Sequence, residues 1–144
     1  MKKLFENRFV EISLDEENAI IEMAWKEDAA YMLPEEFMEA FLKYAELVET
    51  YHPTAYLAYS KEGHGYTIPP EMQQWIAENI APRTFKAGLT TTAIVLSNDL
   101  FVQLGAEEVF EEPETQVFQN RFFRDVEQAR KWLKERSLAA KKVA

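Results

Sequence analysis

The sequence predicts an α/β fold, a single mixed sheet that begins with a β-hairpin and continues as βαβαβα, in the overall order ββαβαβαβα. Two strand-like segments, residues 54–60 and 90–97, are nearly continuous in apolar or β-branched residues, as strands buried on both faces are. They alternate with segments of helical periodicity, which is typical of parallel sheets. With 144 residues, 47% hydrophobic, and only 4 glycines, one domain with a sizeable core is expected. We expect this core to span about residues 9–135, followed by a basic tail at 137–144 that reads as a frayed helix end.

The first predicted elements are the two strands of the hairpin. Residues 9–14 and 19–25 have β-like composition, and the polar residues 15–18 between them have turn chemistry. Residues 26–30 are then expected to form a short charged connector.

A long helix is predicted to begin near Pro34, because proline suits the first helical position and acidic residues follow it. His52 and Pro53 are expected to end it. Its apolar residues recur at helical spacing and predict a buried stripe, which consists of Phe37, Phe41, Tyr44, Val48 and Tyr51.

The second half of the chain predicts three further helices. One opens at Pro69 and Pro70 and stops before Pro82. Another is capped by Asn98 or Asp99, runs through Leu104 and stops at Gly105. Residues 106–114 are expected to be an acidic loop and residues 116–123 the last strand. The final helix follows a sequence that resembles a capping box at residues 125–128.

The crossovers between parallel strands are right-handed, so most helices should lie on one face of the sheet. The alternation along each strand assigns Ile21, Met23, Leu57 and Ile94 to that face. The other face is expected to be half-polar and to carry Ile20, Glu22, Tyr56, Ala58, Ala93, Val95, Gln119 and Arg121. It is a candidate surface for a homodimer or another partner. Alternatively, chain ends and side-chain stems cover it.

Composition excludes several classes of function. A net charge of −9 at pH 7 argues against nucleic-acid binding, which needs clustered basic residues. The absence of cysteine excludes disulfides, thiolate metal sites and cysteine nucleophiles. No signal-peptide core and no membrane span is evident in the sequence. We therefore expect a soluble cytoplasmic protein.

The loop after the strand at residues 54–60 is the candidate site, because ligands and partners dock at the carboxyl ends of strands in open α/β sheets. We expect it to act as a partner-binding, ligand-binding or regulatory loop. Its candidate residues are Ser60, Gly63, His64, Gly65, Tyr66 and Thr67. His64 could shuttle a proton or bind an anion, but a lone histidine between glycines also fits an ordinary loop residue.

The remaining polar clusters do not predict a metal, a cofactor or a catalytic group. The glutamates of residues 107–114 lack the converging spacing of a metal site and are read as a solvated loop. The aromatic residues are a second candidate feature, either as core or as the lining of a pocket for an apolar ligand. They are Tyr51, Tyr56, Tyr59, Tyr66, Trp75 and Phe85.

One family resemblance emerges from the order of elements and from the FF-x-D-x-x-x-A-x-x-W-L pattern at residues 122–133. The chain resembles the SpoIIAA-like group related to STAS (anti-sigma-factor antagonist) domains, and its STAS/SEC14-labelled bacterial members, over residues 9–133. The resemblance implies a small α/β domain that is not an enzyme and regulates a partner protein through its surface. In anti-sigma antagonists a serine or threonine in an Asp-Ser-Ser-Gly-type sequence is phosphorylated. Residues 59–63 match this only at Ser60 and Gly63, so the usual phosphoacceptor motif is absent.

Three functions follow as hypotheses. The first is a non-enzymatic regulatory or protein-interaction domain that uses residues 60–67 and an adjacent helix face. The second is a binder or carrier of a small lipophilic ligand, suggested by the aromatic residues and the SEC14-type label. The third and most remote is an enzyme that uses His64 with Glu62 or Tyr66.

Overall fold

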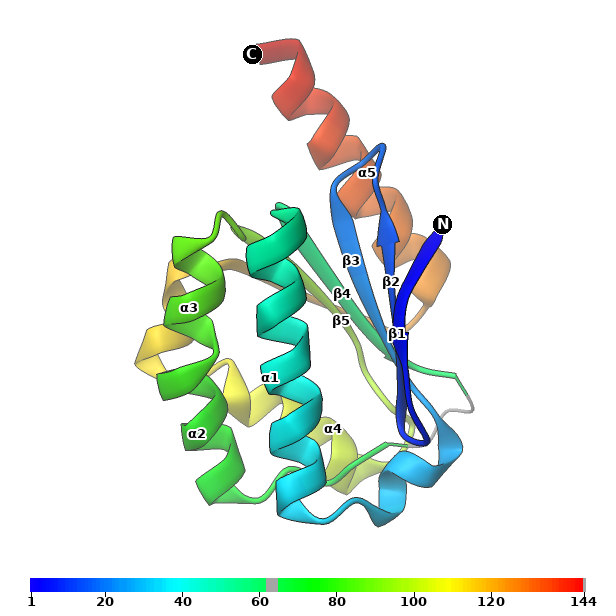
Figure 1. The fold of residues 1–144 in the computed structure, drawn as a ribbon, viewed down its shortest axis with the longest axis vertical. Helices are drawn as coiled ribbons and strands as arrows, with labels where there is room; N and C mark the ends of the chain where they lie inside the picture. Colours follow the sequence, from blue (N-terminus) through cyan, green and yellow to red (C-terminus); the bar gives the residue numbers. More distant parts are fainter. Residues whose placement is uncertain (62–64, 144) are drawn as a thin grey trace.

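The computed structural model describes residues 1–61 and 65–143, with side chains through residue 138, and it contains one six-stranded mixed sheet (Figure 1). The first three strands pair antiparallel, and β3 to β6 pair parallel. The predicted α/β class and single mixed sheet are therefore confirmed. The strands lie side by side in sequence order, as β1 (Lys2–Glu6), β2 (Val10–Asp15), β3 (Ile20–Trp25), β4 (Ala55–Ser60), β5 (Thr91–Val95) and β6 (Gln119–Phe123).

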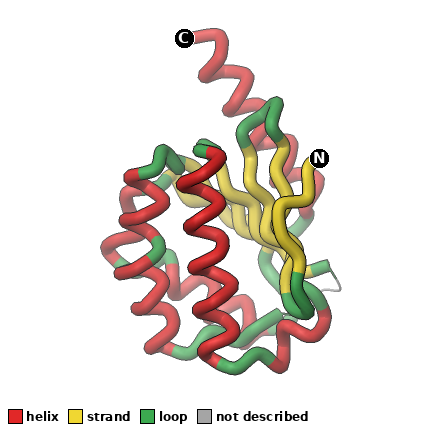
Figure 2. The backbone as a smooth tube through the Cα atoms, in the orientation of Figure 1, coloured by secondary structure: helices red, strands yellow, loops and turns green. Residues whose placement is uncertain are grey.

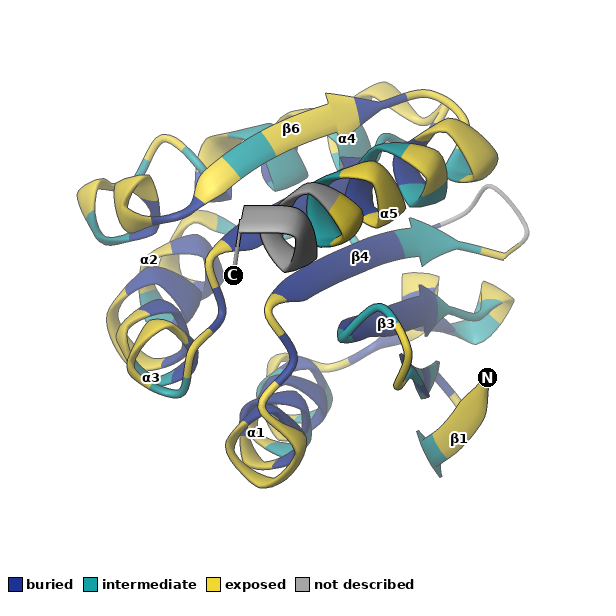
Figure 3. Cartoon of the chain, turned by 90° about the horizontal axis from the view of Figure 1, so that it is seen from above, coloured by how far each residue is buried: buried dark blue, intermediate teal, exposed yellow. Residues whose placement is uncertain are grey.

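Helices cover both faces of this layer of strands (Figure 2). Right-handed crossovers between the parallel strands place α1 to α4 on one face. The last helix follows β6 and packs on the opposite face against β4, β5 and β6, so the sheet lies between α1 and α5 (Figure 3). The helices are α1 (Pro34–Tyr51), α2 (Pro70–Asn79), α3 (Ala81–Lys86), α4 (Leu100–Val109) and α5 (Val126–Val143), with short 3-10 helices η1 (Glu27–Tyr31) and η2 (Pro113–Val117).

Local signals in the sequence locate several element boundaries correctly. The hairpin of β2 and β3 is present, and α1 starts at Pro34. At the other end of α1, His52 adopts a left-handed conformation with a φ of 53° and ends the helix. The carboxylate of Asp99 caps α4 by accepting hydrogen bonds from the backbone N–H groups of Phe101 and Val102.

The prediction for the second half of the chain is wrong in its details. Gly105 does not end α4, because the helix continues through it to Val109, so residues 106–109 are helical. Residues 113–117 form η2, and β6 begins only at Gln119. Pro82 lies in the first turn of α3, where a proline needs no backbone N–H, so it starts a helix as well as following one.

The prediction for the N-terminal region missed a strand and a helical turn. Strand β1 is an edge strand of largely exposed residues that includes Lys2 and Lys3, and so it lacks the apolar alternation that identifies a half-buried strand. The predicted connector at residues 26–30 is mostly the 3-10 helix η1. Tyr51, expected in the buried stripe of α1, is 38% exposed.

The faces of β4 are the reverse of the prediction. Tyr56 and Ala58 pair in register with Ile21 and Met23, and these side chains all lie on the side of α1 to α4. Leu57 instead packs with Ile20 and Ala93 beneath α5. A strand that is apolar on both faces carries no hydrophobic alternation, so its orientation cannot be read from composition.

Two cores result, one on each side of the sheet. The larger lies between the sheet and α1 to α4, and the smaller lies between the sheet and α5. Because α5 covers β4, β5 and β6, that part of the second face is not free to form a dimer interface. In the structure the C-terminal helix α5 covers this part of the second face, which agrees with the expectation that a chain end covers it.

Candidate functional site

The larger core contains a cavity of about 130 Å³ between the sheet and α1 to α4. Its floor is formed by strand residues that include Tyr56, Ala58 and Ile94, and its other walls come from the helices and from loop residues that include Gly65 and Tyr66. Protein interiors are close-packed, with few voids larger than a water molecule, so a space of this size is unusual. It is the candidate site of the protein.

Aromatic rings form much of the cavity wall. On α1, the rings of Phe37 and Phe41 lie 5.0 Å apart between centroids. The ring of Phe37 also stacks on Tyr66 at 4.8 Å, and Tyr44 lies 4.7 Å from Tyr56. Such offset and tilted contacts are the arrangements that aromatic pairs prefer, and they hold the rings in fixed orientations.

The described residues that line the cavity carry no charge. The polar side-chain groups of the lining residues are the hydroxyls of tyrosine, serine and threonine and the indole N–H of Trp25. Most of the buried ones are already hydrogen-bonded within the protein. The hydroxyls of Thr84 and Thr115 donate to backbone carbonyls, and that of Thr92 donates to Oδ1 of Asn120 at 2.6 Å. These hydroxyls are therefore occupied by the fold itself.

Tyr44 is the exception. Its side chain is only 3% exposed and lines the cavity, yet in the described chain its hydroxyl has no hydrogen-bond partner. The neighbouring hydroxyl of Tyr56 donates only to the thioether of Met23, at 3.4 Å, and sulfur is a weak acceptor. Burial raises the pKa of both tyrosines, so each is a neutral phenol that can donate a hydrogen bond.

The hydroxyl oxygen of Tyr44 is not one of the fully buried, unpaired side-chain atoms of the described residues, so it keeps some accessible surface. Phenylalanine at position 44 would keep the ring contacts with Phe41 and Tyr56. The ring contacts alone therefore do not account for the hydroxyl of Tyr44.

The predicted loop contributes to the cavity in part. Ser60, Gly65 and Tyr66 line it, whereas Thr67 is exposed and does not. Gly63 and His64 lie outside the described residues. Ser60 and Tyr66 are half-buried and lie at the carboxyl edge of the sheet, while the lining residues on α1 are buried.

Helix α4 lies against the segment that follows the loop. A Cβ on Gly65 would lie only 2.8 Å from Cγ1 of Val102, which also lines the cavity. A Cβ on Gly105 would lie 3.1 Å from the backbone nitrogen of Ile68. Two glycines thus allow α4 and residues 65–68 to approach closely and to close the cavity on this side.

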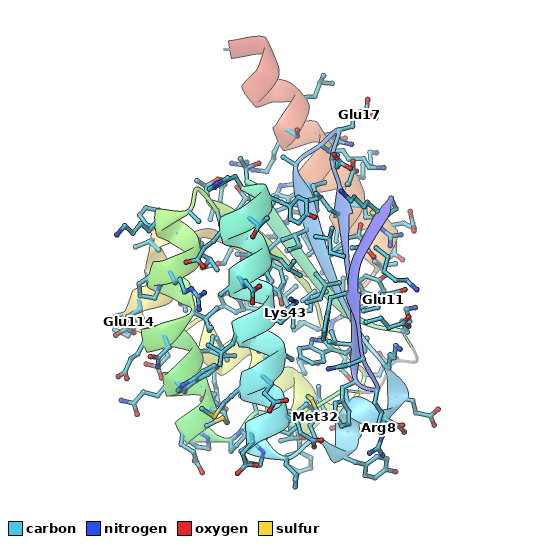
Figure 4. All side chains as sticks on the ribbon, viewed as in Figure 1. Arg8, Glu11, Glu17, Met32, Lys43 and Glu114 are labelled. Carbon is cyan, nitrogen blue, oxygen red and sulfur yellow. The ribbon has the colours of Figure 1, made fainter. Side chains whose placement is uncertain are left out.

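A network of ion pairs holds the residue that opens the loop. The Nζ of Lys61 lies 2.6 Å from a carboxylate oxygen of Glu11, which Figure 4 labels beside β1. Lys3 contacts both Glu11 and Glu6, and Lys26 lies 2.6 Å from Glu6. The end of β4 is therefore tied to the edge of the sheet.

The described residues offer no metal centre, since no three histidine, cysteine, aspartate or glutamate side chains come together among them. The ring of His52 contacts the backbone carbonyl of Ala87 at 3.0 Å, where it joins the end of α1 to the end of α3. Of the two histidines, His52 is the one the structure describes, and its role there is structural.

The sequence predicts some of the residues that line the cavity but not others. Tyr56, Tyr59 and Tyr66 were expected to line a pocket and do so, whereas Tyr51, Trp75 and Phe85 do not. Tyr44 and Phe41 were expected only as core residues of α1. No pattern along the chain distinguishes a core tyrosine from one that lines a cavity.

The chain matches no family model, no curated protein and no solved structure. Across the part of the chain that the structure describes, no helix combines the length and apolar character needed to cross a membrane. The fold and the cavity are therefore the features from which a function can be inferred.

Proposed function

We propose that the protein is a non-enzymatic domain that binds a small lipophilic molecule in the cavity between its sheet and α1 to α4. The observation that carries this proposal is the uncharged, largely apolar space of about 130 Å³. An engineered cavity of about 150 Å³ lined by Leu, Ile and Phe binds benzene. The space in this protein is therefore suited to a molecule of about one ring.

The unfilled space also favours the binding of an apolar molecule. The space of about 130 Å³ leaves the side chains that line it without packing partners on one side, so dispersion contacts are lost there. Water is a poor filling, because each buried water needs two to four polar partners and the wall offers few free ones. A bound apolar molecule recovers the missing contacts.

The test is to titrate the protein with toluene and to measure both heat of binding and the unfolding midpoint. We expect saturable binding and a midpoint that rises with toluene concentration, since a ligand that binds only the folded state stabilises it. Ala58→Leu should abolish the binding because residue 58 lines the cavity. Ala55→Leu is the matched control, because Ala55 is on the same strand but packs beneath α5.

Extraction identifies the natural ligand. Protein purified gently from its own cells is denatured in organic solvent, and the extract is compared with that of Ala58→Leu. A small apolar molecule in the wild-type extract alone supports the proposal. Absence of such a molecule, together with no toluene binding, contradicts it.

A regulatory protein-interaction domain is the second candidate function, and the outer face of α4 favours it. Leu100, Phe101 and Leu104 are exposed there by 59%, 71% and 42%. Helix α4 approaches residues 65–68 through Val102 and Gly105, so it is a helix next to the predicted loop. In a capture experiment, Phe101→Asn should lose a partner that is retained by Leu138→Asn, a change at an exposed leucine on α5. Equal capture by both variants would contradict this function.

A further inference from the structure

We infer that the ligand is an uncharged aromatic molecule of about one ring that carries one polar oxygen, and that Tyr44 recognises this oxygen. The inference rests on the proposed function and specifies the chemistry of the same cavity. It is carried by the size of the space, by the absence of charge among the described lining residues and by the unpartnered hydroxyl of Tyr44.

The wall excludes charged ligands. Neither an acidic nor a basic side chain lines the cavity in the described chain. A carboxylate or an ammonium group placed there would lose its hydration without gaining a counter-charge. The ligand is therefore neutral.

The rings around the space favour an aromatic ligand. Phe37, Phe41, Tyr44 and Tyr56 contact one another at centroid distances of 4.7–5.9 Å in tilted or edge-on arrangements. A further ring in the cavity extends the same kind of packing, in which ring edges meet ring faces.

The two tyrosine hydroxyls define the polar end of the ligand. Tyr44 has a free donor, so it can donate a hydrogen bond to an oxygen of the ligand. Tyr56 uses its proton on Met23 and keeps a free acceptor. A ligand hydroxyl can therefore use one donor on α1 and one acceptor on β4, in a wall that carries no charge among the described residues.

The hydroxyl of Tyr44 has no partner within the described chain and is available to a ligand. A site that offers a hydrogen bond to one oxygen discriminates against ligands that lack this oxygen. Tyr44 thereby selects a phenol-like molecule over a hydrocarbon of the same shape.

The experiment compares phenol with toluene, two rings of similar size that differ in the hydroxyl. Their affinities are measured calorimetrically at pH 7 for the wild type, for Tyr44→Phe and for Tyr51→Phe, a control at a 38% exposed tyrosine on the same helix. We expect Tyr44→Phe to lower the phenol-to-toluene affinity ratio by at least about fivefold. Toluene affinity in this variant and both affinities in Tyr51→Phe should stay unchanged.

The outcomes separate this inference from the proposed function. If the wild type binds toluene but the ratio is the same in Tyr44→Phe, the role of Tyr44 is overturned and the cavity function stands. If the wild type binds neither molecule, both are overturned. The unfolding midpoint of ligand-free Tyr44→Phe provides a further check, because removing an unpaired hydroxyl should not lower it. A lowered midpoint would mean that the hydroxyl is structural, and would overturn the inference.

Discussion

Arg130 on α5 forms a two-pronged ion pair with Glu22 on β3, with Nε 3.0 Å from Oε2 and Nη2 2.9 Å from Oε1. The side chain of Glu22 is 5% exposed and that of Arg130 is 25% exposed. Hydrogen bonding to Glu22 raises the pKa of Arg130, so the guanidinium stays charged. The pair joins the last helix to a strand that lies more than a hundred residues earlier in the sequence.

We predict that Arg130→Met destabilises the protein by about 3–5 kcal/mol, because it leaves the buried carboxylate of Glu22 without a counter-charge. The matched control is Arg83→Met. Arg83 makes the same two-pronged contact with Glu49, at 2.8 and 2.7 Å, but on the surface. Exposed pairs contribute only about 0–1 kcal/mol. Urea unfolding measures the free energy of unfolding of both variants. If Arg130→Met and Arg83→Met lose the same amount, the burial of Glu22 does not add to the cost of breaking its ion pair.

The close approach of Gly65 and Val102 gives a second prediction. Gly65→Ala places a Cβ 2.8 Å from Cγ1 of Val102, so α4 must shift, and we expect a loss of about 1–3 kcal/mol. Val102→Ala should restore much of this loss in the double variant because it removes the atom in conflict.

Gly88 provides the control for this pair. It has a φ of +112°, and a Cβ there would meet no atom within 4 Å. Gly88→Ala should therefore be destabilising through backbone strain alone, and Val102→Ala should not rescue it. A Gly65→Ala variant as stable as the wild type would contradict the close packing of α4 on residue 65.

The void itself predicts an unusual response to a larger side chain. Ala58→Leu adds three carbons that can occupy the cavity, so we expect the ligand-free variant to unfold at a higher urea concentration, by up to about 2 kcal/mol. Ala55→Leu enters the closely packed core beneath α5 and should lose about 1–3 kcal/mol. Two identical changes on opposite faces of β4 are thus expected to have opposite signs. A loss of stability in both would mean that the space near Ala58 cannot accept a side chain.

The parts of the fold that were predictable from sequence depend on neighbours along the chain. Pro34 and His52 mark the ends of α1, and Asp99 caps α4, because each acts on backbone groups a few residues away. The faces of β4 depend instead on its register with β3, which is fixed by residues more than thirty positions apart. Both faces of β4 are apolar, so nothing local could assign them.

The candidate site divides in the same way. The rule that ligands bind at the carboxyl ends of parallel strands led to the loop, and Ser60, Gly65 and Tyr66 do line the cavity. Tyr44 was read only as one residue of a buried stripe. The hydroxyl of Tyr44 is notable because it has no hydrogen-bond partner in the described chain. Only the three-dimensional structure can show that a partner is missing.

The ion pairs at the sheet edge give a prediction for acid stability. Hydrogen bonds from Lys26 and Lys3 lower the pKa of Glu6 from 4.5 to about 2. Bonds from Lys61 and Lys3 also lower the pKa of Glu11. A carboxyl group with a depressed pKa in the folded state stabilises the fold at pH values above the unfolded pKa. This contribution is complete above pH 4.5 and is lost as the pH falls toward 2.

We therefore expect the urea midpoint of the wild type to fall more steeply between pH 4.5 and pH 2 than that of Glu6→Gln, which has no proton to take up at this position. Glu39→Gln serves as the control, because Glu39 is an exposed glutamate on α1 with no ion pair in the described chain. It should follow the wild-type curve. Added salt should reduce the difference between wild type and Glu6→Gln near neutral pH, since Glu6 is open to solvent and its pairs are screened. Identical acid profiles for wild type and Glu6→Gln would show that these contacts do not hold β1 to the sheet in solution.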